Sequence, residues 1–116
     1  MSATVVAAMS GVQVALQAAA TTGSGVVVAP PFTFRNHNIM ITGLAGVTSG
    51  AVSIETSNDP NDAATWALAA TAVTVTTADL LTQLTGIFMF IRARISTTIA
   101  GGGAPGVNVN YLGSRP

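Results

Sequence analysis

The sequence predicts an all-β fold, a single-domain β-sandwich or jelly roll of about eight short strands. Three observations lead to this prediction. Apolar and polar residues alternate with a period of two in several stretches. Turn-forming residues separate these stretches about every 8 to 12 positions, and helical periodicity never lasts beyond one turn. With 116 residues, the chain has the length of one domain.

The first part of the chain has the least regular pattern. Residues 12–18 alternate and predict a strand, although their alanines favour a helix. Residues 26–29 form a short apolar strand that ends at a pair of prolines, because proline keeps its predecessor extended. We expect residues 1–31 to form an extended arm or the first strands, and residues 32–116 to form the sandwich core.

Residues 32–42 are the next predicted strand. Its two phenylalanines share one face, whereas Ile39 and Ile41 have the opposite parity. A face that changes within a strand indicates a β-bulge or a strand that passes between sheets. We place this irregularity at residues 36–38.

The stretch from residue 50 to residue 68 predicts a β-hairpin around which the rest of the chain is organised. In residues 51–57, apolar or β-branched residues alternate with polar ones, which predicts a half-buried strand. Residues 58–62, Asn-Asp-Pro-Asn-Asp, are typical of a turn because their side chains bond the local backbone and the proline cannot donate to a ladder. The return strand follows, with Trp66 and Leu68 on one face.

Four further elements follow the hairpin. Residues 72–77 predict a strand, and residues 78–84 one helical turn with leucines at helical spacing. Residues 86–97 predict the longest strand, and residues 107–112 the closing one.

The longest predicted strand has two different faces. One is apolar throughout, from Ile87 to Ile95. The other consists of Phe88, Phe90, Arg92 and Arg94. Guanidinium groups bind carboxylates bidentately and stack on aromatic rings. These four residues are therefore candidates for contact with another subunit, and the alternative is an intrachain ion pair of the arginines with Glu55 or Asp79.

Composition excludes several functional classes. Four arginines balance four acidic residues, there is no lysine, and charged residues make up 7% of the chain, against about 25% in typical domains. The chain therefore lacks the basic footprint of a nucleic-acid-binding protein. Low charge promotes self-association, which favours an oligomer. The absence of cysteine excludes disulfides and thiolate metal sites. No apolar run approaches the roughly 18 residues of a membrane helix.

Few residues offer catalytic or metal-binding chemistry. His37 is the only histidine, and no nucleophile motif such as Gly-x-Ser-x-Gly accompanies it. We expect a structural histidine or one in a subunit contact. Asp59, Asn61 and Asp62 supply oxygen atoms that suit calcium, but the same residues also form ordinary Asx turns. Nothing in the spacing of the carboxylates requires a glycosidase pair, so we expect neither an enzyme nor a cofactor.

Trp66 has two interpretations. It packs in the core beneath the hairpin, or it is an exposed platform on which a sugar stacks. The second interpretation requires an exposed indole ring.

The hairpin pattern Gly-x-Val-x-Ile-Glu-x-Ser-Asn-Asp, beginning at Gly50, is followed by Trp66-Ala67-Leu68, an arginine-rich strand at residues 90–95 and an alternating strand at residues 107–111. This combination resembles small β-sandwich structural proteins of tailed-bacteriophage virions, and the resemblance extends from residue 39 to about residue 112. It implies a non-enzymatic capsid decoration or cement protein, often trimeric, that binds the major capsid protein or other virion proteins. The expected location is the virion, assembled in the bacterial host cytoplasm.

Two alternatives stay open. The first is a tail, fibre or neck component of the same particle. The second is a carbohydrate-binding or adhesin-like β-sandwich module that uses Trp66, Tyr111 and the loop at residues 58–62.

Overall fold

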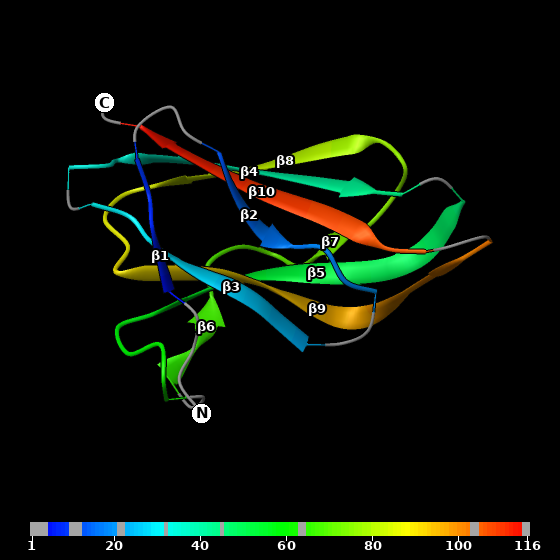
Figure 1. The fold of residues 1–116 in the computed structure, drawn as a ribbon, viewed down its shortest axis with the longest axis horizontal. Coiled ribbons are helices and arrows are strands. Elements are labelled where there is room, and N and C mark those ends of the chain that lie inside the picture. Colours follow the sequence, from blue (N-terminus) through cyan, green and yellow to red (C-terminus); the bar gives the residue numbers. More distant parts are fainter. Residues whose placement is uncertain are drawn as a thin grey trace.

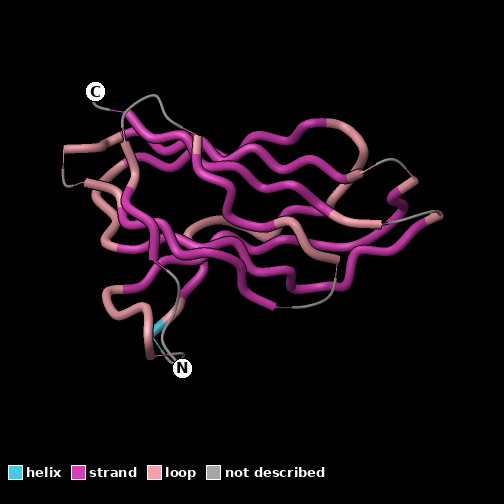
Figure 2. The backbone as a smooth tube through the Cα atoms, in the orientation of Figure 1, coloured by secondary structure: helices cyan, strands magenta, loops and turns pink. Residues whose placement is uncertain are grey.

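Ten β-strands make up the regular structure of the chain in a computed structural model, which describes residues 5–9, 13–20, 23–31, 33–44, 46–62, 65–102 and 105–114. Figure 2 shows strand along most of the trace. In chain order the strands are β1 (Val5–Ala7), β2 (Val14–Gln17), β3 (Gly23–Ala29), β4 (Asn36–Gly43), β5 (Val47–Ser57), β6 (Ala67–Leu68), β7 (Val73–Thr74), β8 (Asp79–Thr85), β9 (Phe90–Gly101) and β10 (Val107–Ser114).

The strands form two sheets that face each other (Figure 1). The six-stranded sheet has the order β1-β3-β9-β5-β6, and β7 also pairs with β5. The four-stranded sheet has the order β2-β10-β4-β8. Neighbouring strands are antiparallel except β1 and β3. The predicted all-β sandwich is confirmed, with ten strands where the sequence predicts about eight.

Side chains from the inner faces of both sheets form the core. The six-stranded sheet contributes Val28, Val52, Ile54, Ile91, Ala93 and Ile95, and the four-stranded sheet contributes Ile39, Ile41, Val107, Val109 and Tyr111. Because successive residues of a strand point to opposite faces, each strand supplies alternate residues to this layer.

The described part of residues 1–31 forms strands of both sheets. The predicted strand at residues 12–18 is observed as β2, and β1 and β3 belong to the other sheet. Gln17 at the end of β2 is buried, and its amide nitrogen donates to the carbonyl oxygens of Gly23 and Ala93 at 3.3 Å. Since Ala93 lies in β9, this side chain joins one sheet to the other.

The predicted helical turn at residues 78–84 is wrong, because the same residues form β8. Leu80 and Leu84 lie opposite Ile41 and His37 of β4, so they have the parity of the inner face, whereas Leu81 is exposed on the outer face. Spacings of one, three and four therefore fit either structure in so short a segment. Pairing with β4 selects the strand.

The irregularity predicted at residues 36–38 is also absent, since β4 pairs with β8 and β10 without a register shift. His37, Ile39 and Ile41 all face inward. Phe34 is buried too, but it precedes the strand and the parity rule does not apply to it. Phe32 lies outside the described residues.

A β-bulge does occur in β5. The register between β5 and β9 shifts around Gly50, whose φ is +129°. A β-carbon at this position would lie 2.8 Å from the Cα of Ile99, so both the backbone conformation and the space require glycine.

The longest predicted strand begins later than expected. Residues 86–89 form a loop, and β9 starts at Phe90. Ile91, Ala93 and Ile95 face the core as predicted, but Ile87 is exposed, because the loop breaks the alternation.

No helix in the described part of the chain is long and apolar enough to cross a membrane.

Candidate functional site

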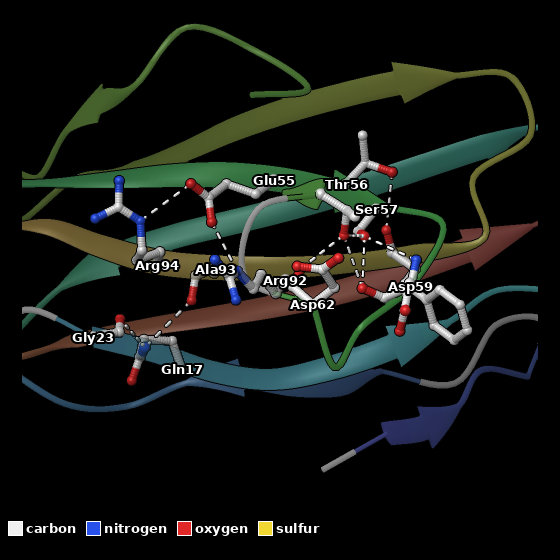
Figure 3. Close-up of polar contacts among 12 residues, drawn as sticks. Gln17, Gly23, Glu55, Thr56, Ser57, Asp59, Asp62, Arg92, Ala93 and Arg94 are labelled. Atoms are coloured by element: carbon white, nitrogen blue, oxygen red, sulfur yellow. Dashed lines mark hydrogen bonds and ion pairs between the residues drawn. The ribbon is translucent and has the colours of Figure 1, made fainter. Parts of the chain in front are cut away.

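The outer face of the six-stranded sheet brings together four residues that the sequence singles out: Glu55, Trp66, Arg92 and Arg94. We call them the arginine–glutamate cluster. Antiparallel pairing places Glu55 of β5 opposite Arg92 of β9, and Ser53 opposite Arg94. Residues two apart on β9 share a face, so both guanidinium groups reach the same carboxylate. Figure 3 shows Glu55 between the two arginines.

Each arginine binds one carboxylate oxygen. Arg92 Nε lies 2.8 Å from Glu55 Oε1, and Arg94 Nε lies 3.1 Å from Glu55 Oε2. The exposed fraction of the side chain is 8% for Glu55, 16% for Arg92 and 39% for Arg94. Two positive charges against one negative charge leave the cluster with a net charge of +1. The cluster can therefore hold the sheet surface together and present Arg94 to an acidic group on a partner.

The predicted intrachain ion pair with Glu55 is confirmed, and the alternative partner Asp79 is wrong. Asp79 belongs to β8 in the other sheet, and its carboxylate accepts a hydrogen bond of 2.6 Å from the hydroxyl group of Thr42. Glu55 is also buried where the sequence predicts an exposed strand face, and both arginines contact its carboxylate there.

Trp66 does not lie in the core, which corrects one of its two sequence interpretations. The guanidinium carbon of Arg92 lies 4.1 Å from the centre of its ring, in a cation–π contact. The ring is partly buried, and its Nε1 atom is buried with no hydrogen-bond partner among the described residues. The hairpin register explains this position. Leu68 lies opposite Glu55, and Trp66 has the parity of Leu68.

Next to the cluster, the hairpin loop is ordered by its own polar groups. Asp59 Oδ1 accepts a hydrogen bond of 3.1 Å from the backbone of Asn61, which is an Asx turn. The hydroxyl group of Thr65 donates to the carbonyl oxygens of Asp59 and Asp62 and also bonds Ser57. Ser57 and Thr65 are structural residues that the alternation pattern does not reveal, since their roles depend on how the loop closes.

Among the described residues, no group of three or more histidine, aspartate or glutamate side chains has the geometry to hold a metal ion. The calcium candidates Asp59, Asn61 and Asp62 all lie in the loop, where Asp59 and Asn61 form the Asx turn. The carbonyl oxygens of Asp59 and Asp62 accept hydrogen bonds from the hydroxyl group of Thr65.

His37 lies in a different place, between the sheets. Its ring is buried, with Nδ1 2.6 Å from the hydroxyl oxygen of Tyr111 and Nε2 2.8 Å from the carbonyl oxygen of Gly86. A carbonyl group only accepts, so Nε2 carries the proton and Tyr111 donates to Nδ1. Burial raises the pKa of Tyr111 and lowers the pKa of His37. Phe88 packs edge-on against the His37 ring at 5.2 Å.

The structure therefore separates the predicted interface candidates. Arg92, Arg94 and Phe90 lie on the outer face of the six-stranded sheet, whereas His37 and Phe88 are in contact at the core. Tyr111 is fully buried, so it does not share a surface with Trp66 as the sugar-binding interpretation requires.

The buried histidine gives a prediction about pH. The unfolded chain binds a proton at His37 below about pH 6.5, whereas the folded state binds it only at lower pH. The free energy of unfolding should therefore fall as the pH falls from about 7.5 to about 5.5, by up to about 1.4 kcal/mol per unit. Urea denaturation at several pH values measures this slope. In a His37→Gln variant the slope should be smaller, and an unchanged slope would contradict the assignment to His37.

Comparisons with protein-family models, with curated proteins and with solved structures found no match to this chain.

Proposed function

We propose that this chain is a non-enzymatic structural protein of a bacteriophage virion, a decoration or cement protein that stabilises the capsid by binding across its subunits. The observation that carries this proposal is the outer face of the four-stranded sheet, which we call the polar outer face. By strand register, its members on β4, β8 and β10 are Asn36, Asn38, Met40, Thr42, Asp79, Leu81, Gln83, Thr85, Asn108, Asn110, Leu112 and Ser114.

The polar outer face suits contact with another protein. Asp79 is its one charged member, and Thr42 already hydrogen-bonds that carboxylate. Asn38 and Gln83 form a side-chain hydrogen bond of 3.0 Å, and Leu81 and Leu112 are exposed beside them. Interface centres are depleted in charge and carry apolar side chains among hydrogen-bonding groups. This face has that composition.

The positions of the ionisable groups further support a function in binding another protein. Glu55 is held by two arginines, and His37 is neutral and enclosed by Tyr111, Phe88 and Gly86. The hollow next to His37 is lined, among the described residues, by amide, hydroxyl and leucine side chains. An acid–base mechanism needs a second titratable group within reach of its substrate, and the lining offers none.

The resemblance of the hairpin and the arginine-rich strand to virion proteins supports the choice of partner. A charged fraction of 7% is low for a free monomer but suits a subunit fixed in a particle. The resemblance also suggests a homotrimer whose symmetric copies repeat one contact around the shell.

The experiment compares copy numbers in purified virions of the phage that encodes the chain. Quantitative mass spectrometry should find many copies of this chain in each particle, about one for every binding position that the major capsid protein offers. A few copies per particle would favour the tail, fibre or neck component. Absence from the virion would contradict both, and glycan binding would then test the adhesin-like module.

A matched pair of variants tests which face binds the capsid. Leu112→Arg adds a charge to the polar outer face, whereas Leu68→Arg adds the same charge beside Glu55 on the opposite sheet. We expect Leu112→Arg to reduce co-sedimentation with empty capsids at least about 10-fold, because an unpaired charge in an interface is costly. Leu68→Arg should bind like the wild type. The reverse result would assign binding to the arginine–glutamate cluster instead.

A further inference from the structure

The free edge of β8 differs from the other sheet edges in the described part of the chain. At the edges of the six-stranded sheet lie β1, with 3 residues, and β6 and β7, with 2 residues each. The other edge of the four-stranded sheet is β2, with 4 residues. β8 has 7 residues and pairs only with β4. It lies along the upper margin of the molecule in Figure 1.

An edge strand exposes unpaired backbone N–H and C=O groups, and monomeric proteins usually protect such edges with lysine, proline, a bulge or a very short strand. β8 has none of these features. Its residues are Asp-Leu-Leu-Thr-Gln-Leu-Thr, and its pairing with β4 has no register shift. The one charged residue, Asp79, is at the end of the strand, where Thr42 hydrogen-bonds its carboxylate.

We propose that β8 pairs antiparallel with β8 of a second copy of this chain, across a twofold axis at Thr82, so that the two four-stranded sheets become continuous. In this register Leu80 lies opposite Leu84 of the second copy, and Leu81 lies opposite its Gln83. Asp79 lies opposite Thr85 of the second copy.

Three properties of β8 make it complementary to itself. The register uses the whole strand, so every outward-facing backbone group finds a partner. The two acidic groups lie at opposite ends of the contact, so no like charges face each other. Leu80 and Leu84 have the parity of the inner face, and their meeting across the axis extends the core of each copy into the other. The contact is isologous, as a twofold axis requires, so it gives a dimer in place of the homotrimer that the resemblance suggests. It does not depend on the proposed virion role.

Two variants with the same altered positions test the register. Leu81 and Gln83 are exposed on the outer face, so both variants should fold normally. In Leu81→Lys/Gln83→Lys, each lysine faces a lysine of the second copy. In Leu81→Lys/Gln83→Glu, each lysine faces a glutamate instead.

Light scattering over a range of protein concentrations measures the mass of each protein. We expect a dimer for the wild type and for Leu81→Lys/Gln83→Glu. For Leu81→Lys/Gln83→Lys we expect a dissociation constant raised about 100-fold, since like charges juxtaposed in an interface cost several kcal/mol. A monomeric wild type would overturn the proposal, and so would equal dissociation constants for the two variants.

Because the chain contains no cysteine, a single introduced thiol reports the contact directly. Thr82→Cys places two thiols next to the proposed axis, where paired strands bring Cα atoms within the range of a disulfide. We expect rapid oxidation to a covalent dimer. Thr48→Cys, at an exposed position of β5 in the other sheet, should form no covalent dimer under the same conditions. Equal cross-linking of both variants would contradict the position of the contact.

Discussion

Glu55→Gln is expected to lower the free energy of unfolding by about 3 kcal/mol, because it leaves two guanidinium groups without their counter-charge. Glu55 and Arg92 are largely buried, so water replaces the lost interaction poorly, whereas Arg94 is partly solvated. The same reasoning orders the single substitutions. Glu55→Gln costs most, Arg92→Gln less, and Arg94→Gln least. Urea denaturation at constant salt measures all three.

Asp79→Asn is the matched control for Glu55→Gln. It removes the same charge from an exposed strand end, and the amide oxygen still accepts the hydrogen bond from Thr42. We expect a change within about 0.5 kcal/mol. If both substitutions lowered the free energy of unfolding equally, the loss would come from the change in net charge and not from the arginine–glutamate cluster.

Ile95→Ala is expected to cost about 3 to 4 kcal/mol, which is a large part of the stability of a domain this size. The Ile95 side chain is 0% exposed in the core between the sheets, so truncation loses apolar burial and leaves a cavity. Thermal or urea denaturation measures the loss.

Ile87→Ala is the same chemical change at a position that the alternation pattern assigns to the same face. Ile87 is 50% exposed in the loop before β9, so we expect a loss below about 1 kcal/mol. Similar losses at both positions would mean that the strand starts before Ile87, as the sequence predicts, and that the loop is wrong.

The hairpin shows which features of the fold the alternation of apolar and polar residues can predict. The strand at residues 51–57, the turn at residues 58–62 and the return strand are all observed, because each depends on local patterns and on turn residues. Their faces are less predictable. Trp66 lies on the outer face because the loop sets the register, and one step in register moves every side chain to the opposite face.

The structures of β8 and of the residues before β9 differ from the sequence predictions for a related reason. Three leucines in seven residues fit a helical turn as well as a strand, and only pairing with β4 distinguishes the two. In residues 86–89 a loop interrupts the alternation, and no residue type there marks the interruption except Gly86.

Local alternation and composition are enough to predict the fold class, the hairpin, the low charge and the few side chains that could take part in acid–base or metal chemistry. The folded chain is needed to establish that Glu55 binds Arg92 and Arg94, that His37 and Tyr111 are enclosed together and that β8 is a long free edge. These features depend on which strands pair and in which register, and residues 37 to 74 positions apart in the chain establish them.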